Sequence, residues 1–376
     1  MAGLYIHIPF CRKKCHYCNF YSLASVKYLD AFYDALPEEI YIRRNYLAGK
    51  SLKSIYFGGG TPTFVNPDII RHSLQSISKY YSIAVDPEIT LEANPDDINK
   101  SLLREYKEIG INRLSIGVQS FFDDDLIYLN RLHSAGQAYQ AVMEAKSAGF
   151  ENLSIDLIYG IPTLTNEKWE QNLEKAFSLD IPHISAYSLT VEEKTALYIL
   201  IQKKALTAPN EDQMIGHFRI LQQKMKEHDY LHYEISNFCK TGWYSRHNSM
   251  YWTGEHYLGI GPSAHSYNGV SRQWNVSNIL QYVDLIARNE RCYQSEELTN
   301  IQRFNERVMV SLRTMWGFDL NKISEEFGDE IASGFRLQAS GYIKSGAMIE
   351  NKGIYTLTDE GKLFADGIAS ELFLET

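Results

Sequence analysis

Three cysteines near the start of the chain have the type and spacing of a metal-binding loop. Cys11, Cys15 and Cys18 form a Cys-x3-Cys-x2-Cys pattern, while Cys239 and Cys292 stand alone far downstream. A disulfide framework spreads its cysteines differently, so this spacing indicates metal binding or redox chemistry. The two downstream cysteines are expected to be buried as small hydrophobic residues.

The number of clustered thiols favours an iron–sulfur cluster. Structural zinc sites use four protein ligands, usually in paired Cys-x2-Cys units, and a fourth cysteine does not lie nearby. Three thiolates suit a cubane cluster, because sulfur matches iron and one iron keeps an open position for a substrate. Two alternatives remain open, namely a zinc site completed by His7 or His16 and a redox-active Cys-x2-Cys pair.

The elements that must position this loop follow a repeated βα pattern. Strands are expected over residues 3–10, 54–58, 89–93, 113–118, 153–159 and 183–189, and helices over segments such as 100–109, 136–148 and 167–177. Runs such as LSIDLIYGIP are apolar on both faces, which is typical of buried parallel strands. Six βα units close as a barrel or open as a doubly wound sheet, and the pattern itself does not choose between them.

Polar residues gather where these strands end. The cysteines follow the first strand, the glycine-rich stretch GGGTPT follows the second, and later strand ends carry Glu92, Gln119, Arg131 and Asp156. Active sites of βα barrels lie at this edge, and side chains of opposite charge there suit a zwitterionic ligand. Taken singly, GGGTPT also fits a tight turn, and a buried carboxylate such as Asp156 also fits a structural role.

Length and composition describe an ordinary globular protein. The chain has 376 residues, of which 44% are hydrophobic and 22% charged, and its net charge is −9. That charge disfavours a protein held mainly by nucleic acid phosphates or anionic lipid. The sequence shows no run of 18 apolar residues, no secretory signal and no transit peptide. We therefore expect a cytoplasmic protein.

The cysteine motif, with Tyr17 before its last cysteine, resembles the signature of the radical S-adenosylmethionine family. The flanking stretches LYIHIPFC and KCHYCNFYS resemble the coproporphyrinogen dehydrogenase group within it, and the similarity runs from Leu4 to about Tyr267. The resemblance implies an α/β fold with a partial (β/α)6 TIM-like barrel and a 4Fe-4S cluster on Cys11, Cys15 and Cys18. It assigns S-adenosylmethionine contacts to Tyr5, Gly60, Thr61, Glu92, Gln119, Arg131 and Asp156.

The chemistry that the resemblance implies is reductive cleavage of a sulfonium. An electron from the reduced cluster splits a carbon–sulfur bond and leaves methionine plus a 5'-deoxyadenosyl radical. The protein's own groups position the cofactor, and chelation of the methionine part at the open iron keeps the transfer short.

A second motif follows in the stretch HNSMYWTGEHYLGIGPSAHSY. Here His247, Asn248, Tyr251 and Trp252 fit an HNxxYW pattern, and His265 follows a glycine-rich turn. Imidazole is a common axial ligand of heme iron, and Tyr or Trp packs well against a porphyrin face. The pattern resembles a motif proposed for heme binding in heme chaperones of this group, although an aromatic-rich loop with one histidine also fits ordinary core packing.

The chain is expected to divide into a radical S-adenosylmethionine barrel at 1–210, an α/β extension at 211–299 and a winged-helix-like domain at 300–376. Residues 301–376 hold 8 Lys or Arg and 12 Asp or Glu, which is a net charge of −4. A net negative charge disfavours binding to the phosphates of DNA. We therefore favour a structural or protein-contacting module over a DNA-binding one.

Two features favour a heme chaperone over the oxygen-independent coproporphyrinogen III oxidase of the same group. Oxidases carry a further cysteine two positions after the third, where this chain has Phe20, and a long extension before the cluster loop, where this chain has ten residues before Cys11. The expected cofactors are the cluster, S-adenosylmethionine and heme. The expected partners are acceptor heme proteins such as respiratory enzymes, a reductant protein, and a membrane contacted peripherally through the acceptor, with no nucleic acid.

Overall fold

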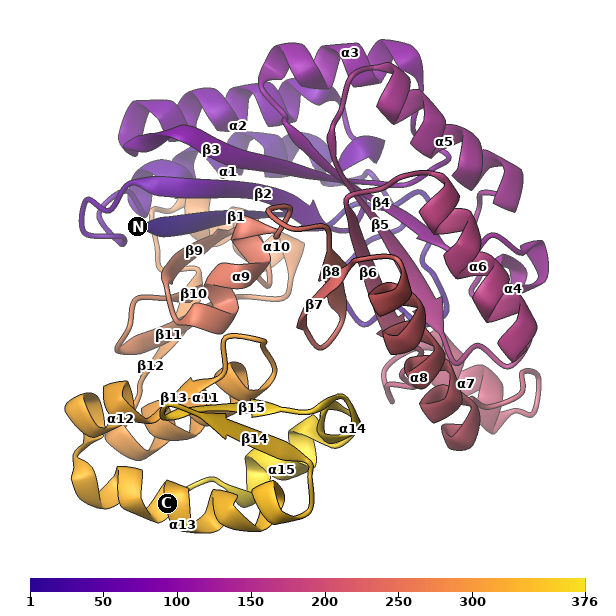
Figure 1. The fold of residues 1–376 in the computed structure, drawn as a ribbon. Helices are drawn as coiled ribbons and strands as arrows, with labels where there is room; N and C mark the ends of the chain where they lie inside the picture. Colours follow the sequence, from indigo (N-terminus) through magenta and orange to yellow (C-terminus); the bar gives the residue numbers. More distant parts are fainter. Residues whose placement is uncertain (376) are drawn as a thin grey trace.

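The computed structural model describes residues 1–375, and its centre is a curved sheet whose first six strands are parallel (Figure 1). These strands are β1 (Ala2–Ile8), β2 (Leu52–Gly59), β3 (Ile83–Ala93), β4 (Arg113–Gln119), β5 (Asn152–Tyr159) and β6 (His183–Ser188). They pair in sequence order, β1 with β2 and so on to β6. All six predicted strands are therefore confirmed.

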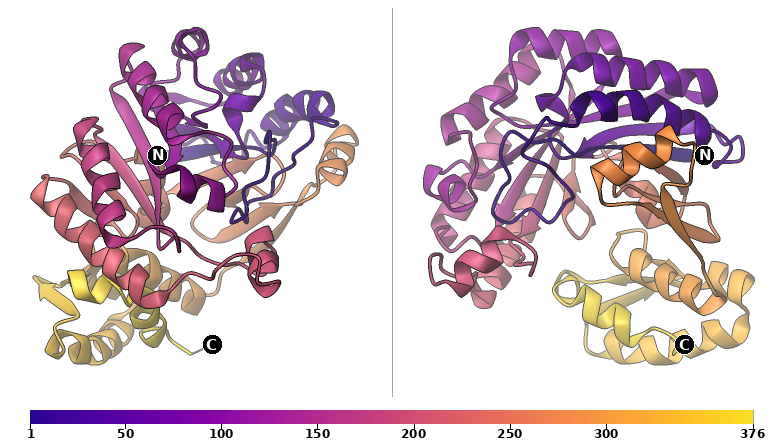
Figure 2. Two further views of the ribbon diagram at one scale, coloured as in Figure 1. Left: turned by 90° about the vertical axis from the view of Figure 1, so that its right-hand side faces the viewer. Right: turned by 180° about the vertical axis from the view of Figure 1, so that it is seen from behind.

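Helices cover the outer face of these strands (Figures 1 and 2). They are α1 (Leu29–Ile42), α2 (Pro67–Tyr80), α3 (Lys100–Ile109), α4 (Asp123–Tyr128), α5 (Ala135–Ser147) and α6 (Asn166–Ser178), with a short 3-10 turn at Pro62–Phe64. Local sequence sets their ends: Asn99 caps α3, Gly110 ends it in the left-handed conformation, and Ser134 opens α5 with a capping box. The three helices predicted from sequence are confirmed within one residue at each end.

The sheet does not close into a full barrel, because both edges of the six-stranded unit pair with later strands. On the β6 side lie β8 (Asn237–Cys239) and β7 (Leu231–Glu234). On the β1 side lie β9 (His256–Ile260), which is parallel to β1, then β10 (His265–Tyr267), β11 (Ser271–Asn275) and β12 (Tyr293–Glu297). The choice between a barrel and a doubly wound sheet thus resolves as a partial barrel.

Residues 211–299 share the apolar core of the six-stranded unit. Their helices are α8 (Glu211–Glu227), α9 (Arg246–Thr253) and α10 (Ile279–Ala287), and α7 (Ala196–Gln202) precedes them. Phe218, Leu258 and Ile279 belong to the same hydrophobic cluster as the strands β1 to β6. This segment therefore extends the barrel at both edges of its sheet, and the domain boundary at residue 210 stays a prediction.

The C-terminal residues form a module with a hydrophobic cluster of its own, which includes Phe304, Phe335 and Leu372. Its elements are α11 (Asn300–Leu312), β13 (Phe318–Asp319), α12 (Leu320–Phe327), α13 (Asp329–Lys344), β14 (Met348–Asn351), β15 (Ile354–Leu357), α14 (Asp359–Lys362) and α15 (Ala365–Glu371). Helices followed by a hairpin and a three-stranded sheet give the winged-helix arrangement expected from the sequence. Figure 1 shows the module below the barrel, on the side of β7 and β9 to β12.

The strands β1 to β6 alternate between two kinds of buried residue. One face, packed on the helices, is apolar, with residues such as Ile55, Leu114 and Ile155. Alternate positions carry polar side chains that are also buried, namely Ser54, Glu88, Thr90, Arg113, Ser115, Ser154, His183 and Ser185. The interior of the partial barrel is therefore polar. Among residues 1–375, no helix has both the length and the apolar character needed to cross a bilayer.

Candidate functional site

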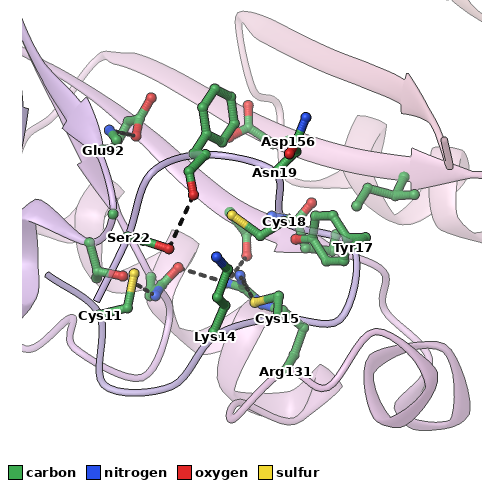
Figure 3. A pocket seen from close by; sticks show the side chains of 18 of the residues that line it. Cys11, Lys14, Cys15, Tyr17, Cys18, Asn19, Ser22, Glu92, Arg131 and Asp156 are labelled. Carbon is green, nitrogen blue, oxygen red and sulfur yellow. Dashed lines mark hydrogen bonds between the residues drawn. The ribbon is translucent and has the colours of Figure 1, made fainter. Parts of the chain in front are cut away.

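The loop between β1 and α1 carries all three clustered cysteines. Two backbone hydrogen bonds close its base, from Cys11 N to Leu23 O at 3.0 Å and from Leu23 N to Pro9 O at 2.7 Å. The amide of Cys18 donates to the carbonyl of Cys15 at 3.4 Å, so the second half of the motif makes a tight turn. As Figure 3 shows, the loop brings the three cysteines to one cavity.

The three thiols are sheltered from solvent. Cys11 is buried, and Cys15 and Cys18 are half-buried. Burial raises the pKa of Cys11 and of Cys18, so both thiols hold their protons at neutral pH and release them when they bind a metal. Arg131 donates from Nη1 to the sulfur of Cys15 at 3.4 Å, which places a positive charge beside that sulfur.

The donor set fits a cubane cluster better than a single zinc ion. Within residues 1–375, no three His, Cys, Asp or Glu side chains surround a position for one ion. Zinc draws its donors to a single point at about 2.0 to 2.3 Å, whereas each cysteine of a cubane binds a different iron. His7 bonds through both ring nitrogens, to Tyr5 and to the Tyr21 carbonyl, so it has no nitrogen left for zinc.

A cavity of about 490 Å³ opens beside the cysteine loop. Its walls come from the carboxyl ends of β2 to β6, because parallel strands deliver their last residues to the same edge of a sheet. Polar lining residues on these strands or just after them include Thr61, Glu92, Asn94, Ser115, Gln119, Asp156 and Tyr187. Arg131 also lines the cavity, but it lies in the loop between α4 and α5 and not at a strand end as the sequence suggested. The structure thus brings together Glu92, Gln119, Arg131 and Asp156, and their contacts with a ligand stay a prediction.

Glu92 is the best-anchored carboxylate of the cavity. The hydroxyl of Tyr56 donates to Oε1 at 2.8 Å, and the amide of Gly59 donates to Oε2 at 3.0 Å. Burial raises the pKa of Glu92 to about 7; the Tyr56 hydrogen bond lowers it and the nearby Asp156 raises it. The charge of Glu92 therefore changes close to neutral pH.

Asp156 lines the same cavity as Glu92 (Figure 3). The hydroxyl of Ser115, on the neighbouring strand β4, donates to Oδ1 of Asp156 at 3.2 Å. Burial raises the pKa of Asp156, and the hydrogen bonds from Ser185 and Ser115 oppose that change. Two half-buried carboxylates in one cavity make a site for a ligand with a positive charge or with hydroxyl donors.

Arg131 ties the cavity to the cysteine loop. Besides Cys15, its guanidinium donates from Nη2 to Asn94 Oδ1 at 2.7 Å and to the Gly117 carbonyl at 3.0 Å. Asn94 in turn donates to the hydroxyl of Thr61 at 3.0 Å. Arg131 and Asn94 therefore connect the cysteine loop with β3 and with Thr61 after β2. The same cavity holds the positive charge of Arg131 and the two carboxyl groups of Glu92 and Asp156.

The glycines of GGGTPT are required by close packing against the cysteine loop. A Cβ on Gly60 would lie 2.7 Å from the Phe10 carbonyl oxygen, and one on Gly59 would lie 2.4 Å from the His7 ring. The amides of Gly60 and Thr61 donate to the carbonyls of Ile8 and Phe10 at 2.8 and 2.7 Å. These amides therefore hold the start of the cysteine loop and are not free to bind a ligand.

Gln119 ends β4 with a left-handed backbone, at a φ of 66°. The backbone of a non-glycine residue is strained in this conformation. Such residues occur where the surrounding structure imposes the strain, often at functional sites. Gln119 is buried and lines the cavity.

The remaining predicted residues lie away from this cavity. Tyr5, on β1, does not line it, and its hydroxyl bonds to His7 Nδ1 at 3.0 Å. His247 and Tyr251 lie inside the barrel on α9 and bond to each other at 2.9 Å. Trp252 points elsewhere and lines a second cavity, of about 340 Å³, together with Trp316 of the C-terminal module. The motif residues His247, Tyr251 and Trp252 therefore do not share one surface.

Sequence reasoning missed several residues of the site. Tyr56 holds Glu92, and Asn94 holds Arg131, yet neither stood out in the sequence. Asn94 was detectable, because it lies two positions after Glu92 at the same strand end. Tyr56 gave no such signal, since a tyrosine within a buried strand has the pattern of ordinary core packing.

Family models match both ends of the chain. A model described as the Radical SAM superfamily matches residues 5–176, and a model described as the HemN C-terminal domain matches residues 298–364. The first match contains the cysteine loop and the strand ends that line the cavity. The second covers most of the winged-helix-like module.

Curated relatives match nearly the whole chain. Heme chaperone HemW of Bacillus subtilis is 36% identical over 372 residues, which is 98% of this chain and 98% of that protein. Heme chaperone HemW of Lactococcus lactis is 31% identical over 372 residues, with coverage of 99% and 97%. A mitochondrial protein of Danio rerio, named radical S-adenosyl methionine domain-containing protein 1, is 34% identical over 322 residues, with coverage of 83% and 72%.

A solved structure shares the fold over the same length. Coproporphyrinogen III oxidase (HemN) from Escherichia coli, described as a radical SAM enzyme, superposes with a TM-score of 0.85 at 23% identity. The match covers 99% of this chain and 90% of that one. At this identity the likeness shows the architecture, namely the partial barrel with its C-terminal module.

Proposed function

The chain belongs to the heme chaperone HemW family of radical S-adenosylmethionine proteins, and we propose that it binds heme and passes it to apo heme proteins. The observation that carries this proposal is full-length similarity to proteins named heme chaperone HemW, which spans both the cysteine loop and the HNxxYW helix. A reductant protein and acceptors such as respiratory enzymes belong to the same proposal, with peripheral membrane contact where the acceptor is membrane-bound.

Membership of the radical SAM family implies a 4Fe-4S cluster and S-adenosylmethionine. We propose Cys11, Cys15 and Cys18 as the cluster ligands, because these three thiols line one cavity and lack a fourth cysteine. When bound and reduced, the cluster supplies one electron to a sulfonium. The chain shelters the sulfurs in part from water and holds a positive charge, that of Arg131, beside Cys15.

The cavity walls fit the rest of S-adenosylmethionine. We propose that Arg131 pairs with the carboxylate of the methionine part, and that Glu92 and Asp156 accept hydrogen bonds from its ammonium group and ribose hydroxyls. Gln119 supplies an amide for the remaining polar groups. Gly60 lets the end of β2 pack closely against the backbone of the cysteine loop, and Thr61 orients Asn94. Tyr5 does not line the cavity, and its ring lies 6.0 Å from that of Tyr56, so we propose that it supports Tyr56 and does not itself contact the ligand.

For heme we propose the segment around α9. Trp252 lines the cavity between α9 and the C-terminal module, and the guanidinium of Arg313 lies 5.5 Å from its ring. An indole that packs on a porphyrin face, next to a cation that pairs with a propionate, is a reasonable heme contact. Axial ligation by His247, with Tyr251 beside it, requires that the imidazole leave the hydrogen bonds it makes inside the barrel.

The proposal is tested by hemin titration of the anaerobically reconstituted protein, followed by mixing with an apo heme protein. We expect a stoichiometric Soret change on titration and transfer of that absorbance to the acceptor. Failure to bind hemin, or bound hemin that never reaches any acceptor, contradicts the chaperone function.

The second candidate function is oxygen-independent oxidation of coproporphyrinogen III. We consider it because the chain shares its fold with HemN. Phe20 occupies the position where the oxidase group has its further cysteine, and it lies 68% exposed at the cavity. We expect reduced, reconstituted protein to leave coproporphyrinogen unchanged in the presence of S-adenosylmethionine. Formation of protoporphyrinogen would replace the chaperone proposal with the oxidase.

A further inference from the structure

His247, the histidine of the HNxxYW motif, is enclosed in the barrel interior. It is 2% exposed. Its Nδ1 bonds to Ser54 Oγ at 2.8 Å, and its Nε2 bonds to the Tyr251 hydroxyl at 2.9 Å. Its backbone amide also donates to Glu88 at 3.0 Å. Three contacts, with Ser54 on β2, Glu88 on β3 and Tyr251 on α9, therefore hold this residue and its ring in place.

The imidazole of His247 stacks on Tyr56, whose hydroxyl bonds to a residue that lines the cavity. The two ring centroids lie 4.9 Å apart with an angle of 27° between the planes. At its far end, Tyr56 donates from its hydroxyl to Glu92 at 2.8 Å. A continuous line of contacts thus runs from α9, through His247 and Tyr56, to a carboxylate of the cavity.

The stack controls where the Tyr56 hydroxyl points. Tyr56 is 8% exposed, and its ring is held between its neighbours on β1 and α9, Tyr5 at 6.0 Å and His247 at 4.9 Å. Loss of the imidazole would open a void against this ring, because protein interiors relax only partly around a deletion. The tyrosine would then be free to tilt, and the hydrogen bond to Glu92 would weaken.

We propose that His247 is a positioning residue of the S-adenosylmethionine site, which acts by holding Tyr56 so that its hydroxyl orients Glu92 toward the ligand. The inference rests on the proposed function, since it takes Glu92 as a ligand contact. It gives the first residue of the HNxxYW motif a role in the cofactor cavity that is independent of heme.

The proposal has a signature in pH, because the Tyr56 hydrogen bond favours the charged form of Glu92. The pKa of Glu92 is about 7. The charged or titratable groups that face it from the surrounding elements are Tyr5 on β1, Tyr56 on β2, Arg113 on β4, Asp156 on β5, Tyr187 on β6 and Tyr251 on α9. The tyrosines have pKa values raised above 10 by burial, so they stay neutral over the relevant range.

The experiment measures S-adenosylmethionine binding to the anaerobically reconstituted full chain by equilibrium dialysis, at pH values on both sides of neutrality. The variants are Tyr56→Phe, which removes one hydroxyl and keeps the stack, and His247→Asn, which removes the ring. Ser249→Ala is the matched control on α9, since the hydroxyl of Ser249 has no hydrogen-bond partner within residues 1–375. Should His247→Asn fail to fold, Tyr56→Phe still tests the line of contacts.

We expect both Tyr56→Phe and His247→Asn to weaken binding about 10-fold at neutral pH, as loss of a hydrogen bond to a charged group does. Both should also move the acidic limb of the binding profile to higher pH, with Ser249→Ala unchanged. In a Glu92→Gln background the two substitutions should add nothing, because the group on which they act has lost its charge.

Two results would overturn the inference while leaving the proposed function intact. One is wild-type binding by both variants across the pH range. The other is weakened binding that persists in the Glu92→Gln background, which would indicate a general structural defect. A wild-type chain that fails to bind S-adenosylmethionine would instead overturn the proposed function and the inference together.

Discussion

The two sites predicted from the sequence behave in opposite ways when the chain folds. The cofactor cavity gathers residues that are far apart in sequence, from Cys11 to Asp156, at one edge of the sheet. The HNxxYW motif spans six residues on one helix, yet the structure separates its members. His247 and Tyr251 lie inside the barrel, and Trp252 faces the C-terminal module.

The difference comes from the geometry of the elements that carry the residues. Parallel strands all end at the same edge, so any residue just after a strand reaches the same cavity. A helix turns by about 100° per residue, so positions four apart share a face and positions five apart do not. Sequence proximity therefore predicts a shared site for strand ends and not for a helix.

The largest expected effect is at the cysteine loop. Cys15→Ala should abolish the brown iron–sulfur absorbance of the anaerobically reconstituted protein, because two thiolates hold a cubane poorly. Cys239→Ala is the control, since Cys239 is buried and far from the loop in sequence. An unchanged spectrum for Cys15→Ala would remove this cysteine from the ligand set. It would also contradict the view that the residues gathered at the strand ends form one site.

The next effect concerns the charge of Glu92. Glu92→Gln should weaken S-adenosylmethionine binding on the order of 100-fold at pH 8, since a charge-assisted hydrogen bond contributes about 1.5 to 3 kcal/mol. The raised pKa of about 7 means that the charged form is lost as pH falls through neutrality. Wild-type binding should therefore weaken below about pH 7, and the variant should show no such limb.

The matched control for this prediction is Glu170→Gln, which changes an exposed carboxylate on α6. It should reproduce both the affinity and the acidic limb of the wild type. Binding by wild-type protein that is flat from about pH 5 to 8 would remove Glu92 from the ligand contacts.

A smaller effect tests the helix side of the comparison. Trp252→Ala should weaken hemin binding about 10-fold, as loss of a large aromatic contact does at an interface. Tyr139→Ala, which removes an exposed aromatic ring on α5, is the control and should titrate as wild type. Equal hemin affinity for both variants would place heme away from the cavity between α9 and the C-terminal module.

The smallest effect is on stability. Gly60→Ala should lower the free energy of unfolding by about 2 kcal/mol, because the new methyl group has no room and the backbone must shift. Gly136→Ala is the control, since a Cβ there meets nothing closer than 3.8 Å. Denaturant titration measures both variants, and equal midpoints would show that the close approach to the cysteine loop is not tight.

Much of the fold was predictable because hydrophobic periodicity reports burial directly. The six strands, and helices such as Lys100–Ile109, follow from apolar runs and capping residues alone. Barrel curvature was not predictable from those runs, because it depends on how β1 and β6 pair with strands that come much later in the chain. The short strands β7 to β12 carry mixed polar and apolar residues, so they gave little signal.

The parts of the site that depend on residue type and spacing were predictable. The cysteine spacing and the charged strand ends were visible in the sequence, and Glu92 and Asp156 do line the same cavity in the structure. The supporting contacts were not visible, because Tyr56 and His247 meet only through the packing of α9 against β2. Only the structure shows that both nitrogens of His247 are engaged inside the barrel.

The central claim is tested most directly by metal and sulfide analysis of protein purified without oxygen. The account predicts about four irons and four sulfides per chain, with an electron paramagnetic resonance signal of the reduced protein that changes when S-adenosylmethionine is added. Zinc as the sole metal, or a signal indifferent to S-adenosylmethionine, would contradict it.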